Sequence, residues 1–489
     1  MTTAQTTPGD LARQVDQATA GASSGQPLRR GSLRFLRTAA LPIGVQGPTA
    51  GVIIGPAIIA GIVGEPGALA QVLALAAMAF VAYAFVVFAR AFNTAGSVYA
   101  FNGTALGPGY GFVSAWLLLL VYASFAAGVY ASTADIAQAL LASLGLHAGW
   151  AWLGLAGAAA ALALALTSIG FSSLVILACE GASVALITAV AVAVLRAGGY
   201  HHHGITAAPF SAHGVSLAVL ALGVTAVFGQ FSGFESAATL GEEAHRSTRT
   251  IPAAITWSLV GAAAIYIFFT WIVYSAYPSP AAVAADPAPL VHVAGAYLSS
   301  PVGVAVNAAG LVSAFGAQLA CLNAAARLLY ALGREAGGGP GRFLTRTWAR
   351  HGSPSGALAV TGAASIAGLA AFSAEPAATR AATLIIQYGA YLILATYLLT
   401  VIAALAWTWR TRPRPVPLAV LATGVAVLGY VLYRTFVPFP AAPFGWVALA
   451  AGASAAAGTA LLLVPGFLAR LRSSPLLAVT AAARSAQRP

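Results

Sequence analysis

Long apolar runs recur along this chain, and most are long enough to cross a membrane as a helix. A helix rises 1.5 Å per residue, so about 20 residues span the roughly 30 Å hydrocarbon core of a bilayer. Only 7% of the residues are charged and 60% are hydrophobic, whereas soluble domains average about 25% charged. A membrane β-barrel would instead show short alternating segments. The sequence therefore predicts an all-α integral membrane protein.

Twelve apolar runs can be counted, which predicts twelve transmembrane helices. They lie near residues 39–63, 68–89, 112–134, 149–167, 172–196, 216–240, 252–276, 301–331, 355–373, 380–408, 416–436 and 444–466. The remaining ends, residues 1–38 and 467–489, contain 5 and 4 arginines. We expect them to be cytoplasmic tails, the first of them disordered.

The net charge of +12 comes from arginine alone, because the chain contains no lysine. With the N-terminus inside, 20 of the 23 arginines fall in cytoplasmic segments, and only Arg196, Arg380 and Arg434 fall outside. This asymmetry follows the positive-inside rule. It predicts that both termini are cytoplasmic and that the protein is a multi-pass protein of the plasma (inner) membrane. The charge therefore indicates no nucleic-acid partner.

The apolar run before Pro252 is interrupted in its middle. Its central part, from Val227, reads VFGQFSGFESAATLGEEAHRSTRTIP, with Gly229 and Gly233 four residues apart and Glu235 inside an uncharged stretch. Each mid-helix glycine costs about 1 kcal/mol against alanine. In a membrane, loosened backbone is tolerated only where protein or a wet cavity surrounds it. A buried acid there marks a functional site, so this stretch predicts a broken helix that carries a binding site.

The first apolar run is interrupted as well. It contains Pro42, Pro48 and Pro56, and proline inside a helix removes a backbone hydrogen bond. We expect residues 48–51 to be the unwound point. The other interrupted helix follows five helices later. Broken helices at matching places in two halves are typical of inverted-repeat transporters with a binding site at the membrane midplane.

The run GFESAATLGEEAHRSTRTIPAAI, residues 233–255, resembles the signature around the sixth helix of the amino acid–polyamine–organocation (APC) transporters. The rest of the chain resembles them in outline. The resemblance implies a LeuT-like fold, in which five-plus-five inverted repeats have their first and sixth helices broken. Residues 39–408 would then form the transporter core, and residues 409–466 would add two helices outside it.

An amino acid needs donors for its carboxylate and acceptors for its ammonium, and the ends of broken helices provide both. The family's GSGIF motif aligns with residues 49–53. The resemblance thus assigns the substrate carboxylate to the amides of Thr49, Ala50 and Gly51. It assigns the ammonium to carbonyls near Gly47, Gly229 and Ser232. The third, eighth and tenth helices offer polar residues, among them Tyr122, for a side-chain pocket.

Two embedded acids are candidates for proton coupling or gating. Glu235 occupies the family's acidic position, and an unpaired carboxyl at that depth favours its neutral form. Glu180 lies in the fifth helix. For both acids, a purely structural, hydrogen-bonded role stays open. At the inner end, residues 242–249 contain Glu242, Glu243, Arg246 and Arg249, which form either a gate network or ordinary helix-end charges.

Other motifs add no chemistry. The GGGPG run at 337–341 lacks the Lys-Ser/Thr of a phosphate-binding loop and predicts a flexible linker. The histidines at 201–203 lie in an outer loop, where we expect them to be solvated. We expect no metal and no cofactor, and no nucleophile constellation indicates an enzyme.

The sequence thus predicts a secondary-active amino acid transporter working by alternating access, either proton-coupled or as an exchanger. Its partners would be a small-molecule substrate and the lipid bilayer, with homo-oligomerisation left open. The alternatives are a polyamine or organic-cation carrier and a non-transporting nutrient sensor.

Overall fold

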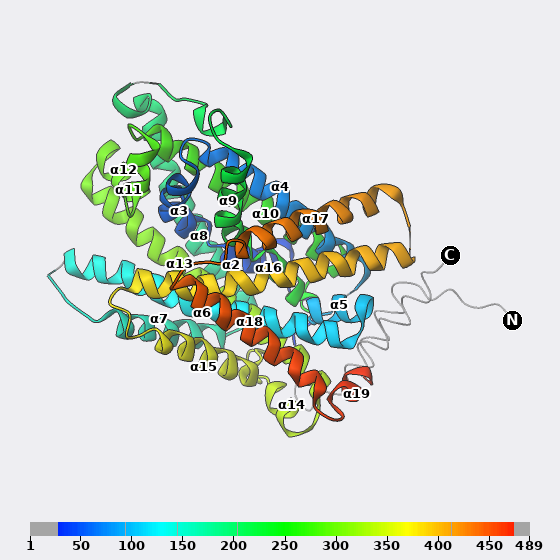
Figure 1. The fold of residues 1–489 in the computed structure, drawn as a ribbon. Coiled ribbons are helices and arrows are strands. Elements are labelled where there is room, and N and C mark those ends of the chain that lie inside the picture. The colour runs from blue at the N-terminus through cyan, green and yellow to red at the C-terminus, as the bar shows by residue number, and fades with distance from the viewer. Residues whose placement is uncertain (1–27, 93, 144, 203, 412, 474–489) are drawn as a thin grey trace.

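The computed structural model describes residues 28–473 apart from 93, 144, 203 and 412. Within those residues every regular element is a helix, with no β-strand and a single isolated bridge between Leu33 and Ala244. Figure 1 shows the long helices gathered into one bundle, with short helices at its two ends. The all-α prediction is therefore confirmed.

Ten helical segments are long and apolar enough to cross a membrane. They are built from α2 (Phe35–Gln46) with α3 (Pro48–Val63), α4 (Gly67–Ala91), α6 (Pro108–Ser143), α8 (Ile169–Ala197), α9 (Leu217–Phe228) with two short 3-10 helices, α10 (Ser247–Ser275), α13 (Ser300–Ala336), α16 (Ala378–Thr411), α17 (Pro415–Phe436) and α18 (Phe444–Ala460). Two further apolar helices, α7 (Trp150–Ala165) and α15 (Ser355–Ala371), have 16 and 17 residues. Each of the twelve predicted apolar runs coincides with one of these segments.

The first span is broken between α2 and α3. The break lies at Gly47, whose φ of 52° and ψ of 58° are left-handed, one residue before the predicted unwound stretch. Glycine adopts this conformation without a steric penalty. Pro48 then occupies the first position of α3, where its missing N–H is not needed. Residues 48–51 are therefore the first turn of a helix.

The segment from α9 to residue 240, the sixth predicted run, is broken where the glycines predict. After α9, η3 (Gly229–Phe231) ends at Ser232, which is extended, and Gly233 has a φ of 117° before η4 (Phe234–Leu240) begins. A Cβ on Gly233 would lie 2.6 Å from Cγ1 of Val45. The two broken spans are therefore in close contact at Gly233, where there is no room for a larger side chain.

The helices around the breaks form the core of the molecule. The α6 helix packs against both α13 and α16, and α10 packs against α4. The α17 helix packs on the outside against α16 and α4, and α18 packs against α16 and α6. The breaks are therefore enclosed, whereas α17 and α18 lie at the periphery.

Short helices occupy several connections, the end of the twelfth predicted run and the start of the C-terminal tail. These are α5 (Val98–Leu106), η1 (Tyr200–His202), η2 (Ala208–Phe210), α11 (Pro280–Ala285), α12 (Pro289–Tyr297), α14 (Gly338–Leu344), η5 (Leu461–Leu463) and α19 (Phe467–Arg472). The prediction of a flexible linker over 337–341 was wrong in part. Gly338–Leu344 is helical, and a Cβ on Gly341 would lie 2.6 Å from the Gly333 carbonyl oxygen. This close packing against α13 holds the glycine-rich turn in place.

The predicted N-terminal tail, residues 1–38, is too long, because its last residues are packed against the protein. Leu28 and Leu33 are 3% and 1% exposed, and α2 begins at Phe35. The part of the predicted tail over residues 1–27 lies outside the described residues, as does most of the C-terminal tail.

Candidate functional site

The two breaks lie side by side and are joined by hydrogen bonds. The Gln46 side chain donates to the Phe231 carbonyl oxygen (3.3 Å). The hydroxyl of Tyr266, on α10, lies 2.8 Å from the Gln46 carbonyl oxygen and 3.1 Å from that of Gln230. Backbone carbonyls that the broken helices leave unpaired are thus satisfied across the junction. The candidate binding residues of both breaks therefore belong to one site.

The amides predicted to hold a carboxylate lie in the first turn of α3. The Ala50 amide donates to the Ser313 hydroxyl oxygen (3.2 Å), and the Gly51 amide donates to the Gly47 carbonyl oxygen (2.9 Å). The Gly51 amide is therefore taken up by a hydrogen bond at the start of α3 and is not free for a ligand. The Thr49 amide also lies at the helix start, where an α-helix offers no acceptor. Of the three amides, that of Thr49 is left as the donor at the helix start, because the Ala50 amide is already bonded to Ser313.

The carbonyls predicted to hold an ammonium lie around the same junction. The Gly47 oxygen accepts from Gly51, and the Gly229 oxygen accepts from the Ser232 amide (3.1 Å) and hydroxyl (2.5 Å). The side chains of Thr49 and Ser232 are closed off from solvent, with exposures of 0% and 2%. The site therefore has donors on one broken span and acceptors on both, and it is shut in this conformation.

Glu235 lies on η4, directly after the break, and accepts three hydrogen bonds. The Gly233 amide donates to Oε2 (2.8 Å), the Tyr122 hydroxyl on α6 donates to Oε1 (3.0 Å), and the Tyr397 hydroxyl on α16 donates to Oε2 (2.6 Å). The residue is 1% exposed. One carboxyl thus ties the broken span to two others. Sequence reasoning placed Tyr122 near the substrate side chain instead and did not single out Tyr397.

Glu180 lies on α8, which is continuous, and reaches the other break. The Ser313 hydroxyl on α13 donates to Oε1 (2.5 Å), and the Thr49 hydroxyl on α3 lies 3.4 Å from Oε2. Ser313 also accepts from the Ala50 amide. This carboxyl therefore also connects a broken span to two others. Ser313 had no distinguishing pattern in the sequence.

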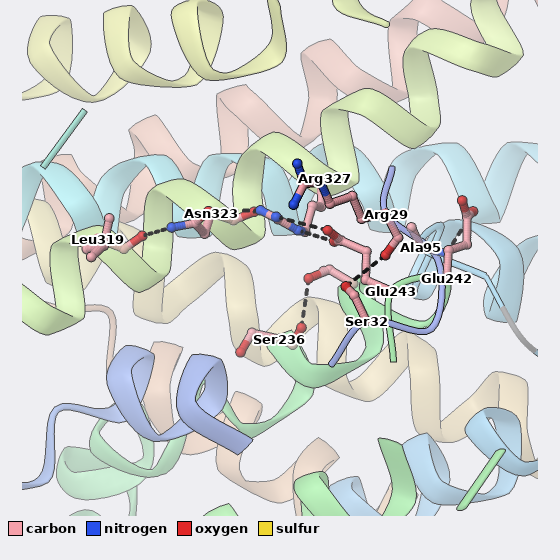
Figure 2. Close-up of polar contacts among 10 residues, drawn as sticks. Arg29, Ser32, Ala95, Ser236, Glu242, Glu243, Leu319, Asn323 and Arg327 are labelled. Atoms are coloured by element: carbon pink, nitrogen blue, oxygen red, sulfur yellow. Dashed lines mark hydrogen bonds and ion pairs between the residues drawn. The ribbon is translucent and has the colours of Figure 1, made fainter. Parts of the chain in front are cut away.

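The two acids after η4, Glu242 and Glu243, pair with α13 and not with the neighbouring arginines. Arg327 donates to both oxygens of Glu243 (2.5 and 3.4 Å) and to the Asn323 side-chain oxygen (2.9 Å). Figure 2 shows Arg327 held between Glu243 and Asn323. Arg246 and Arg249 are exposed instead. Arg246 has a left-handed backbone conformation and directly precedes α10. The structure therefore favours a charge network over ordinary helix-end charges. The arginines in that network are Arg327 and Arg334, not Arg246 and Arg249.

Glu242 forms the second ion pair of this network, with Arg334. Its Oε1 also accepts from the Ala95 amide (3.3 Å). Burial alone would raise the pKa of Glu242, but the charge and hydrogen bond of Arg334, the Ala95 amide and Arg30 together lower it below its ordinary value. Glu242 is therefore held as a carboxylate.

A segment at the N-terminal side, residues 28–33, covers this network. The Leu33 amide donates to the Glu243 carbonyl oxygen (3.0 Å), and the His245 amide donates to that of Leu33 (2.8 Å). Arg29 donates to the Arg350 carbonyl oxygen (3.0 Å). Figure 2 shows Arg29 and Ser32 beside the two acids. The segment thus fastens the turn after η4 to the loop before α15.

Metal ligation finds no support in the described part of the chain. Among those residues, no group of three or more His, Cys, Asp or Glu side chains is placed to hold a metal ion. His201 and His202 are exposed. Cys179 and Cys321 are free thiols.

The sequence is similar to those of known transport proteins. A family model described as amino acid permease matches residues 33–456. The chain is 27% identical over 290 residues to the branched-chain amino acid permease BcaP of Lactococcus lactis subsp. cremoris (strain MG1363), a match that covers 55% of this chain and 61% of BcaP. It is 26% identical over 273 residues to the low-affinity putrescine importer PlaP of Escherichia coli (strain K12), covering 54% of this chain and 59% of PlaP. The chain thus spans about three fifths of the length of these relatives.

Proposed function

The chain belongs to the amino acid permease family of the APC superfamily, and on that premise we propose that it carries amino acids across the membrane by secondary-active transport. It is a multi-pass membrane protein of a transporter family and not of an enzyme family. We place it in the plasma (inner) membrane with both termini in the cytoplasm, as the arginine distribution favours.

We propose the LeuT-like arrangement of twelve spans, with α7 and α15 as the fourth and ninth. The support is that the breaks fall in the first and sixth spans, as an inverted repeat of five spans requires. Residues 39–408 form the transporter core in this proposal, and α17 and α18 lie outside it. Alternating access then rocks spans 1, 2, 6 and 7 against spans 3, 4, 8 and 9.

The observation that best supports an amino acid as substrate is the meeting of donors and acceptors at the two breaks. The first turn of α3 offers the Thr49 amide and, once it releases the Ser313 hydroxyl, the Ala50 amide, and a helix N-terminus favours a carboxylate. The carbonyls of Gly47 and Ser232 offer acceptors for an ammonium, and the Gly47 oxygen, which accepts from Gly51, keeps a second lone pair. The Gly229 oxygen already accepts two bonds from Ser232, so it accepts from a substrate only after one of these is released. A zwitterion can therefore bind without any charged side chain, and Gly51 shapes the cradle.

A polyamine is the second candidate substrate, which the similarity to a putrescine importer favours. A dication needs carboxylates that are open to it. Glu235 and Glu180 are the acids nearest the breaks, and both already accept hydrogen bonds from buried hydroxyl groups. The amino acid is therefore the better supported substrate. Proton coupling through Glu235, or exchange, completes the proposed mechanism, with the ion pairs of Glu242 and Glu243 as the inner gate.

Uptake into proteoliposomes tests the function directly. We expect accumulation of labelled branched-chain amino acids to exceed that of labelled putrescine at equal concentration. Putrescine uptake alone would establish the polyamine carrier. Binding of either compound with no uptake would establish a sensor.

Two glycine variants test the binding site. Gly51→Leu should abolish substrate binding, because a Cβ at Gly51 already meets Cε1 of Tyr266 at 2.8 Å. Thr49→Ser should be mild. The control is Gly261→Ala on α10, where a Cβ meets nothing within 4 Å. If folded Gly51→Leu protein keeps wild-type affinity in a thermal-shift titration, the site does not lie in the first span.

A further inference from the structure

An apolar groove runs along the outside of the molecule between the end of α16 and the start of α17. Its floor is made of Ile402, Leu405 and Ala406 on α16 and of Leu418, Ala419 and Ala422 on α17, and its volume is about 570 Å³. Both helices are membrane-spanning segments. Figure 1 shows the end of α16 and the start of α17 at the right-hand side of the bundle. The groove therefore faces the hydrocarbon region of the bilayer.

The sequence that joins the two helices is positively charged. The connecting sequence RTRPR carries Arg410, Arg412 and Arg414 within five residues, and no Asp or Glu follows Glu375 anywhere in the chain. Arg410 is one of the residues that line the groove, and its guanidinium donates to the Ala105 carbonyl oxygen (2.7 Å). A guanidinium has five N–H donors, so further donors remain for a ligand. Arg414 is exposed at the start of α17.

Trp409 marks this end of the groove as the membrane boundary. It lines the groove and is 67% exposed. Tryptophan is enriched at the level of the lipid headgroups. The apolar floor thus lies at the depth of the acyl chains, and the arginines lie at the depth of the phosphates.

We propose that this groove is a binding site for an anionic phospholipid, with one acyl chain along the floor and the phosphate held by Arg410 and Arg414. Basic pockets between transmembrane helices bind anionic headgroups. The acyl chain gains little by leaving other lipid tails, since both surroundings are apolar. The headgroup therefore decides which lipid binds, and an anionic lipid is favoured over a zwitterionic one. This inference does not depend on the transported substrate.

A second copy of the chain fits the groove poorly. A two-fold contact brings the same patch of both subunits together. Here it would place the arginines of both copies close to one another, and the chain beyond Glu375 offers no acid to neutralise them. A phospholipid satisfies both the apolar floor and the charge at its end.

Native mass spectrometry of the purified full-length protein tests the proposal. The probes are phosphatidylglycerol and phosphatidylcholine with identical acyl chains. We expect one phosphatidylglycerol to be retained with an affinity on the order of tenfold above that of phosphatidylcholine. The double variant Arg410→Gln/Arg414→Gln should lose this preference. Arg380→Gln is the matched control, because Arg380 lies at the opposite end of α16 and is exposed.

The floor of the groove is tested separately. Ala419 is exposed, so Ala419→Phe should fold normally, fill the groove and weaken retention of both lipids, whereas Ala419→Ser should not. Equal retention of the two lipids by wild-type protein overturns the proposal. So does a phosphatidylglycerol preference that survives the double arginine variant. Inorganic phosphate that competes fully, with no effect of Ala419→Phe, would reveal an anion site only. A dimer that Ala419→Phe dissociates would assign the groove to a second copy.

Discussion

Two buried carboxyl groups reach the two helix breaks, and the structure anchors them differently. Glu235 lies on the broken span itself and accepts from the backbone amide of Gly233 within the break. Glu180 lies on a continuous helix and reaches the other break only through the hydroxyls of Thr49 and Ser313. Any movement of the sixth span must therefore move Glu235, whereas the first span can leave Glu180 behind.

The hydrogen-bond clusters around Glu235 and Glu180 nevertheless connect corresponding spans. Glu235 joins the sixth span to the third (Tyr122) and the tenth (Tyr397). Glu180 joins the fifth span to the first (Thr49) and the eighth (Ser313). In the proposed five-plus-five repeat, exchanging the halves converts spans 1, 8 and 5 into spans 6, 3 and 10. The clusters occupy equivalent places, and the difference between them lies in which span carries the acid.

Removing the Glu235 carboxyl should have the largest effect. Glu235→Ala leaves three buried donors without an acceptor, and we expect a loss of stability of about 4 kcal/mol. Glu180→Ala should lose about half as much, because one of its contacts is long, 3.4 Å. Unfolding in mixed micelles measures both. Equal losses would erase the proposed difference between the clusters.

The inner gate should respond to pH separately from either cluster. The pKa of Glu242 is lowered in the folded protein, so its ion pair stabilises the fold above the ordinary value of 4.5 and is lost as the pH falls through the folded value. Glu242→Gln should therefore cost about 3 kcal/mol at pH 7, and the difference from wild type should shrink below pH 4.5. Thermal unfolding across this range measures it. A constant difference at all pH values would contradict the assignment.

Single hydroxyl deletions should separate the two clusters more finely. Tyr397→Phe removes one donor from Glu235, which should cost about 2 kcal/mol and move the midpoint of the pH profile of uptake to higher pH. Ser313→Ala, the counterpart at Glu180, should cost about 1 kcal/mol and leave the midpoint in place. A midpoint that moves only in Ser313→Ala would assign coupling to the fifth span.

The positions of the spans and of the sixth-span break could be predicted from sequence, because apolar length and paired glycines act locally. The first break was placed one residue late, since proline marks a helix start as readily as a helix defect. Tyr397, Ser313 and Arg327 could not be assigned their partners. Each meets its acid from a span far away in sequence, and nothing around the residue distinguishes it from an ordinary helix contact.

The most direct test of the account is the pH dependence of substrate uptake by Glu235→Gln and Glu180→Gln in proteoliposomes. Glutamine keeps the size of each side chain and cannot titrate. The account predicts that Glu235→Gln flattens the pH profile while retaining some exchange, and that Glu180→Gln keeps the wild-type profile with reduced stability. A wild-type profile in Glu235→Gln together with a flat profile in Glu180→Gln would contradict it.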